Sequence, residues 1–143
     1  MGGHTPGHWG WFGTDHGVYL ATRHSGRRFV MGFRRMGMNG AQPTFQIDKK
    51  GMIPASELVQ FEVGDKAVRG FAEAKKAETV YRYDVVAIDH PDARLIAAAP
   101  DMLAALKAWK AAENMADIDA MVKAEGEACV LRDKAIAEAE GQA

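Results

Sequence analysis

The sequence predicts an α+β protein in which an N-terminal antiparallel sheet of about five or six strands packs against C-terminal helices. Short segments of strand composition, separated by turn signals, fill residues 1–88, whereas apolar residues in 89–140 recur at the three- and four-residue spacing of helices. Because the strands all precede the long helices, the order favours an antiparallel sheet over a parallel βαβ arrangement. The 143 residues fit a single domain, 1–143.

The first part of the chain is expected to form a hairpin preceded by a loose leader. Residues 1–7 are rich in glycine and polar groups, and the aromatic run 9–12 predicts either a short first strand or an aromatic plug over the core. After an Asp-His-Gly turn, residues 18–22 have strand composition. Residues 28–34 follow as the next strand, so that the two form a hairpin with a short loop at Ser25-Gly26.

The middle of the chain combines irregular and strand-like segments. Residues 36–43 contain two glycines and a proline and are not expected to form regular structure. Residues 44–48 alternate as a half-buried strand does, residues 49–51 indicate a tight turn, and 54–57 indicate a brief helical turn. The strict alternation of 59–63 gives the clearest strand in the chain.

The last strand and the helices follow. We predict a short helix over 65–76 and the longest strand over 80–88. Asp89-His90-Pro91-Asp92 is a helix-start signal with an acid at the cap, and Pro100-Asp101 indicates that a second helix starts there. One apolar stripe continues across this proline: Leu95, Ile96, Ala99, Met102, Leu103, Leu106 and Trp109.

A break at Glu113-Asn114 separates these residues from a last helix over about 117–140. The apolar stripe of this helix is sparse on an alanine-rich background, which indicates either a solvated helix or one that packs on a second chain. We therefore expect a homo-oligomer formed through the C-terminal helix. Cys129 falls in this helical pattern and is expected to be a small buried apolar residue.

Composition places the chain among ordinary globular proteins, with 48% hydrophobic and 26% charged residues. The start of the chain lacks the features of a signal peptide, and no apolar run is long enough to span a bilayer, so a cytoplasmic protein is expected. The net charge of −1 is unevenly placed, because the basic residues are in excess in 1–50 and the acidic ones in 51–143. Either the two halves attract each other or the first half presents a basic face.

Metal and cofactor chemistry is not indicated. No glycine-rich phosphate-binding motif lies between a strand and a helix, and a single cysteine excludes the paired-cysteine zinc motifs. The four histidines in the first 24 residues are expected to be too loosely held for a native metal site: His4, His8, His16 and His24. We therefore predict no metal and no cofactor.

Enzyme activity is not expected either. Neither serine lies in the context of a nucleophile elbow, and Asp117 and Asp119 point to different faces of a helix. Asp89 and Asp92 fit helix capping better than acid–base catalysis. His90, which precedes the helix-starting proline, is expected to be a local cap or a packed side chain.

Arginines concentrated between residues 23 and 35 are the main candidates for a binding site. In a regular strand the residues of one face would be exposed and those of the other would enter the core, with Arg28, Val30, Gly32 and Arg34 outside and Phe29, Met31 and Phe33 inside. Arginine suits bidentate capture of phosphate, and nearby aromatic rings can stack on a base. The candidate residues are Arg23, Arg27, Arg28, Arg34, Arg35, Trp9, Trp11 and Tyr19. The alternative is that these arginines pair with acids of the C-terminal helices.

Two segments resemble a known group of sequences. His4-Thr5-Pro6-Gly7-His8-Trp9 is similar to the Thr-Pro-Gly-Pro-Trp opening of many small, uncharacterised phage and prophage accessory proteins, although His8 stands where those proteins usually have proline. The segment 92–106, with the sequence Asp-Ala-Arg-Leu-Ile-Ala-Ala-Ala-Pro-Asp-Met-Leu-Ala-Ala-Leu, resembles their shared helical segment. The resemblance implies origin in a mobile element and the cytoplasm of a bacterial host. It implies no activity and no catalytic residues, but many small phage proteins block host defences.

These observations lead to one main hypothesis and two alternatives. The main hypothesis is a non-catalytic binding protein that counters a host defence component, either by inhibiting a host protein directly or by sequestering a small anionic signal of nucleotide type. The first alternative is nucleic-acid binding by the basic hairpin, against which the near-neutral net charge counts. The second is a minor virion or assembly protein.

Overall fold

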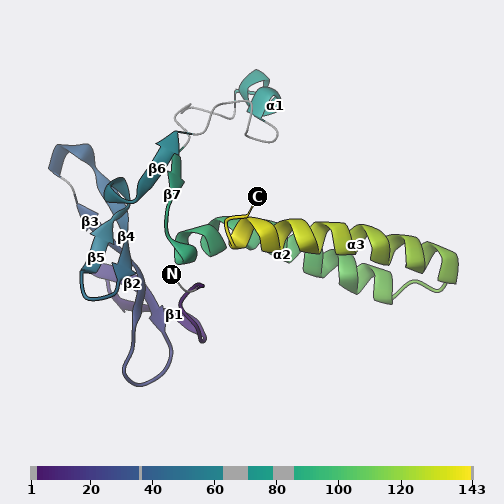
Figure 1. The fold of residues 1–143 in the computed structure, drawn as a ribbon, viewed down its shortest axis with the longest axis horizontal. Coiled ribbons are helices and arrows are strands. Elements are labelled where there is room, and N and C mark those ends of the chain that lie inside the picture. Colours follow the sequence, from purple (N-terminus) through teal and green to yellow (C-terminus); the bar gives the residue numbers. More distant parts are fainter. Residues whose placement is uncertain (1–2, 36, 63–70, 79–85, 143) are drawn as a thin grey trace.

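A computed structural model describes residues 3–35, 37–62, 71–78 and 86–142. It confirms the predicted α+β class, with an N-terminal sheet of five antiparallel strands followed by two long C-terminal helices. The sheet lies at one end of the molecule and the helix pair projects away from it (Figure 1). A second, two-stranded sheet lies beside the larger sheet, on the side of the short helix α1 (Phe71–Lys76).

The larger sheet is a meander in which every strand pairs with the strand that follows it in sequence. All four pairings are antiparallel. The strands, in sheet order, are β1 (Trp9–Thr14), β2 (Gly17–Thr22), β3 (Phe29–Arg35), β4 (Ala41–Ile47) and β5 (Gly51–Pro54). The aromatic run at the start of the chain is therefore a strand.

The turn between β1 and β2 depends on Gly13. This residue has a φ of 124°, and a Cβ atom there would overlap the carbonyl oxygen of Gly17. Only glycine can therefore occupy this position without moving the backbone. The Asp15-His16 loop predicted from the sequence closes this hairpin, because Thr14 pairs with Gly17.

The segment 36–43 was expected to be irregular, and this prediction is wrong for its second half. Residues 37–39 form a short 3₁₀ helix, η1 (Gly37–Asn39), but β4 begins at Ala41 and includes Pro43. Proline is tolerated there because β5 ends opposite Thr44, so β4 has a paired neighbour on one side only at Pro43. The helical turn predicted near residue 55 is confirmed as η2 (Ala55–Glu57), whereas β5 was not predicted.

A separate antiparallel pair is formed by β6 (Val59–Glu62) and β7 (Val86–Ile88). The strands predicted over 59–63 and 80–88 therefore pair with each other instead of extending the larger sheet, although residues 63 and 80–85 lie outside the described residues. The helix predicted over 65–76 is described only from residue 71, as α1 (Phe71–Lys76).

The two long helices are α2 (Pro91–Glu113) and α3 (Ile118–Ala139). The predicted restart at Pro100 is wrong, because α2 continues through this proline as one helix. Proline removes one backbone hydrogen bond but is compatible with a helix that is held by packing on both sides of it. The predicted break is confirmed, since Asn114 caps the end of α2 and Asp117 caps the start of α3.

Alanines form the contact between α2 and α3. On α2 the buried alanines recur every seven residues, and the two on α3 have the same spacing: Ala98, Ala105 and Ala112, then Ala128 and Ala135. Small side chains at this spacing let two helices approach closely. The apolar stripe predicted from the sequence lies to one side of this alanine seam, and its Leu103 and Leu106 are exposed. Cys129 is half-buried rather than buried.

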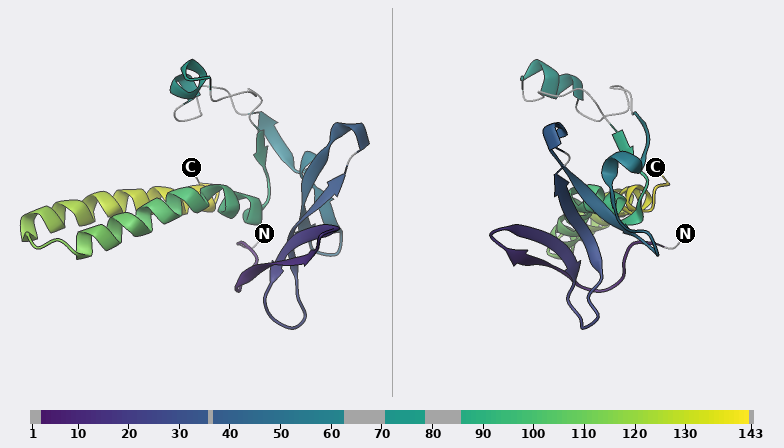
Figure 2. Two further views of the ribbon diagram at one scale, coloured as in Figure 1. Left: turned by 180° about the vertical axis from the view of Figure 1, so that it is seen from behind. Right: turned by 90° about the vertical axis from the view of Figure 1, so that its left-hand side faces the viewer.

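The helix pair meets the sheet at the first turn of α2, while most of its length extends away from the sheet (Figure 2). No helix among the described residues is long and apolar enough to cross a membrane. The packing of the whole molecule therefore depends on a small junction at the start of α2.

Candidate functional site

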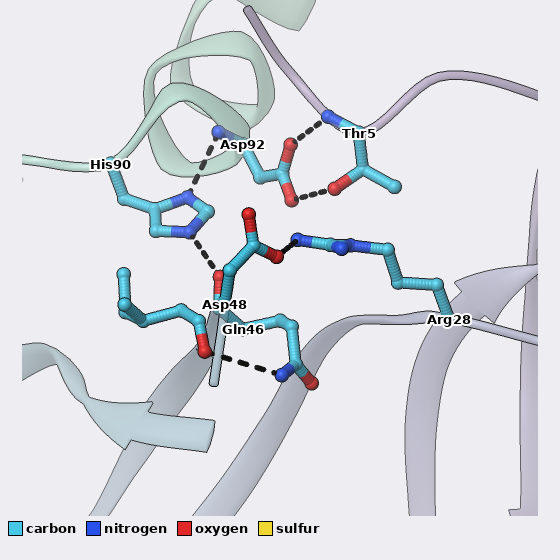
Figure 3. A network of polar contacts seen from close by, with 7 residues as sticks. Thr5, Arg28, Gln46, Asp48, His90 and Asp92 are labelled. Carbon is cyan, nitrogen blue, oxygen red and sulfur yellow. Dashed lines mark hydrogen bonds and ion pairs between the residues drawn. The ribbon is translucent and has the colours of Figure 1, made fainter. Parts of the chain in front are cut away.

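The junction is built around Asp92, a fully buried residue in the first turn of α2. Its carboxylate accepts two hydrogen bonds from Thr5: the backbone N–H donates to Oδ1 at 2.5 Å and the hydroxyl to Oδ2 at 2.7 Å (Figure 3). An acidic residue is favourable at a helix N-terminus, where the backbone dipoles point their positive ends. Asp92 therefore ties the leader to α2, and the expectation of a loose leader is wrong at Thr5, which is buried.

His90 links α2 to the sheet and confirms the expected role of a cap or packed side chain. Its Nδ1 accepts the Asp92 backbone N–H at 3.1 Å, so the ring proton lies on Nε2, which donates to the carbonyl oxygen of Gln46 at 2.9 Å. The ring also stacks on Phe45 of β4, with 5.2 Å between the ring centroids. The sequence suggested an acid at the cap of α2, but the capping residue is His90. Asp89 instead forms an ion pair with Arg94 at 3.1 Å.

The candidate arginines do not form one continuous face. Each of four finds a partner on or beside the larger sheet. Arg23 donates to the Trp9 carbonyl oxygen and Arg34 to that of Met52, Arg27 lies 3.6 Å from the centroid of the Phe12 ring, and Arg28 pairs with Asp48 at 2.7 Å. The partner of Arg28 follows β4 directly, so it is not one of the acids of the C-terminal helices that the sequence suggested.

The predicted division of β3 into a polar face and a core face is wrong. Val30 is completely buried, whereas Phe33 is 55% exposed and Phe29 is also exposed. The two-residue alternation is kept but has the opposite phase, because Gly32 is buried together with Val30 while Met31 is only half-buried. Which face of a strand enters the core depends on how the strand pairs with its neighbours, and here the pairing with β2 is irregular at Val30, so the residues of β3 alone did not predict it.

The three aromatic candidates have different environments. Trp9 is half-buried, and its indole N–H donates to the Thr5 carbonyl oxygen at 3.1 Å. Tyr19 packs between Phe12 and Phe29, with ring centroids 6.2 and 4.8 Å away. Trp11 is 61% exposed. Only Trp11 therefore presents most of its ring to solvent.

A cavity of about 500 Å³ lies beside the junction and joins the leader to the loop between β2 and β3. Two of the predicted residues, Arg27 and Arg28, line it, while Arg34, Arg35, Trp11 and Tyr19 do not. Sequence reasoning did not find the remaining residues of the lining, which are Thr5, Pro6, Thr22, His24, Gly26, Phe29 and Gln46. The one sequence signal near them was the Ser25-Gly26 turn, which predicted a loop beside His24 but no cavity.

The lining of the cavity includes two arginines and one histidine, together with Phe29, whose side chain is partly exposed. The ion pair between Arg28 and Asp48 is largely open to solvent, with 43% and 78% of the two side chains exposed. Exposed ion pairs contribute little to stability, so an incoming anion can compete with Asp48 for this guanidinium. Within the part of the chain that the structure describes, no three His, Cys, Asp or Glu side chains come together as a metal site would require.

No family model, no curated protein and no solved structure matches this chain. The opening segment 4–9 and the helical segment 92–106 lie in contact, because Thr5 of the first bonds Asp92 of the second. Arg27 and Arg28 thus lie next to the junction that these segments build.

Proposed function

We propose that this protein is a non-catalytic binding protein that takes a small anionic ligand of nucleotide type in the cavity lined by Arg27 and Arg28. The observation that carries the proposal is that Arg27 and Arg28 line one cavity together with Phe29, whose side chain is partly exposed. Guanidinium groups bind phosphate oxygens through paired, charge-assisted hydrogen bonds. The ring of Phe29 is available to stack on a base.

The neighbours of these arginines support the same chemistry. Arg27 is held over the Phe12 ring, so its guanidinium loses less freedom when it binds an anion. Arg28 can exchange Asp48 for a phosphate group. The His24 side chain, whose Nδ1 donates to the neighbouring Ser25 carbonyl oxygen at 2.8 Å, adds a further polar group at the rim.

The proposed role follows from the resemblance to phage accessory proteins. In the cytoplasm of a bacterial host, a protein that binds a nucleotide signal without converting it would lower the free concentration of that signal and so counter a defence that depends on it. Direct inhibition of a host defence protein through the same surface is the other form of this role. Native mass spectrometry of the protein isolated gently from host cells distinguishes the two, since it reports a bound small anion or a bound protein.

Replacing both cavity arginines, Arg27→Gln with Arg28→Gln, is expected to weaken ligand binding about 100- to 10,000-fold, because each of the two lost charge-assisted hydrogen bonds is worth about 1.5–3 kcal/mol. The measurement is isothermal titration calorimetry against nucleoside mono-, di- and triphosphates and cyclic dinucleotides. The matched control is Arg34→Gln with Arg35→Gln, which removes the same charge outside the cavity. Equal losses in the two double variants would contradict the proposal.

Nucleic-acid binding is the second candidate, favoured by the exposed ring of Trp11. It predicts an affinity for single-stranded oligonucleotides that falls steeply with salt concentration and that is reduced by Trp11→Ala. Binding of oligonucleotides but of no mononucleotide in the same titrations would replace the first proposal with this one.

A further inference from the structure

The helix pair carries large apolar side chains that nothing in the described chain covers. On α2, Leu103 and Leu106 are exposed, the second by 67%. On α3, Ile118 and Val122 are exposed, the first by 70%, as is Ile136. The seam between the two helices meanwhile buries only alanines, so the largest side chains of the pair contribute little to the packing within one chain.

These side chains lie on one face of the pair. From Ile118 to Ile136 the chain advances 18 residues, which is five turns of a helix, and from Leu95 to Leu106 it advances 11, close to three turns. Leu95 and Ile136 line a common cavity of about 490 Å³ near the start of α2, which places the two stripes on the same side. We call this side the apolar face, made of Leu95, Met102, Leu103, Leu106, Ile118, Val122 and Ile136.

We propose that the apolar face binds the same face of a second copy of this chain, with the two helix pairs antiparallel, to form a four-helix bundle. Burying a leucine or isoleucine contributes about 1.5–3 kcal/mol, and two-fold packing of helix pairs places such residues in a shared core. The proposal does not depend on the ligand cavity, which is formed by the leader and the sheet.

The face is complementary to itself in shape. Its cavity lies at the end where α2 begins and α3 ends, while the exposed Ile118 lies at the opposite end, where α3 begins. A two-fold axis that lies in the contact plane, perpendicular to the helices, places each end of the face against the opposite end of the partner's face. Ile118 of one copy would then face the cavity of the other.

The charges at the two ends are complementary as well. Lys110 lies seven residues after Leu103, hence on the same side of α2, near the end of that helix. Glu140 lines the cavity at the other end, where the charge of Arg94, which also lines it, is paired with Asp89. In the antiparallel arrangement, Lys110 of one copy approaches Glu140 of its partner, whereas a parallel arrangement would bring like charges together.

The extent of the face suits a dimer. The 23 residues of α2 span about 35 Å, and two adjacent helices are about 20 Å wide, which gives roughly 700 Å². A stable protein–protein interface buries about 800 Å² on each partner. The face is therefore close to the size that a second copy needs.

Size-exclusion chromatography with light scattering tests the proposal on the full chain. The wild type is expected at twice the monomer mass of 15.5 kDa. Leu106→Glu with Ile118→Glu should raise the dimer Kd about 100-fold or more, with helix content by circular dichroism unchanged. Val130→Glu is the matched control, because Val130 is exposed on α3 but lies two residues after the buried Ala128 and points away from the apolar face.

A second pair of variants tests the antiparallel arrangement. Lys110→Glu should weaken the dimer, and adding Glu140→Lys should restore it, which would not occur if the two residues were far apart between copies. A wild-type monomer at all concentrations up to about 100 μM, or equal dissociation by Val130→Glu, would overturn the proposal, including the case in which a different protein covers this face.

Discussion

Asp92→Ala is expected to lower the free energy of unfolding by about 3–5 kcal/mol, the largest loss for any single substitution considered. The variant removes both acceptors of Thr5, so that a buried backbone N–H and a buried hydroxyl lose their partners. Each hydrogen bond to a charged group contributes about 1.5–3 kcal/mol. Urea denaturation followed by circular dichroism measures the change.

Asp89→Ala is the matched control, three residues earlier. This variant also removes a carboxylate, the partner of Arg94, but the ion pair is partly exposed, and such pairs contribute at most about 1 kcal/mol. The double variant of Thr5→Val and Asp92→Ala should lose less stability than the sum of the two single losses, because both substitutions remove the hydrogen bond between the Thr5 hydroxyl and Asp92. If Asp92→Ala and Asp89→Ala proved equally stable, the buried carboxylate could not be what holds the leader.

His90→Ala is expected to cost about 3 kcal/mol. The loss combines a helix cap, the hydrogen bond to the Gln46 carbonyl oxygen and the ring contact with Phe45, each worth about 1 kcal/mol. Thermal and urea unfolding of the full chain measure it.

His90→Asn separates the contributions of His90. Asparagine is a good helix cap but is too short to reach the sheet as the imidazole does. This variant should therefore recover about 1 kcal/mol relative to His90→Ala. A full recovery would mean that the contact with the sheet contributes nothing, and no recovery would mean that capping contributes nothing.

Local signals predicted the elements well where one residue type has one dominant role. The start of α3 at Asp117 and the turn at Asp15-His16 follow directly from capping and turn chemistry. Pro100 was misleading because helix propensity considers the lost backbone hydrogen bond but not the packing of α2 on α3 along its length. The alanine seam was missed for a related reason: apolar size predicted the stripe through Leu103, whereas close approach of two helices requires small residues.

The site was predicted only in part. Composition identified Arg27 and Arg28, which do share a cavity, but it grouped them with Arg34 and Arg35, which do not line it. The irregular pairing at Val30 could not be seen from one strand, because it arises from how β3 pairs with β2. The bond between Thr5 and Asp92 joins two polar residues without any periodic pattern, and no rule of spacing predicts such a pair.

The separation of Thr5 from Asp92 along the chain, 87 residues, has a consequence for the order of folding. The meander and the helix pair are built from contacts between neighbouring segments, which form quickly because little chain entropy is lost in closing short loops. The leader can dock only after both exist. Substitutions at Asp92 should therefore leave the refolding rate nearly unchanged and accelerate unfolding, which the two arms of a stopped-flow denaturant series would separate. The junction thus sets how long the folded molecule lasts rather than how fast it forms.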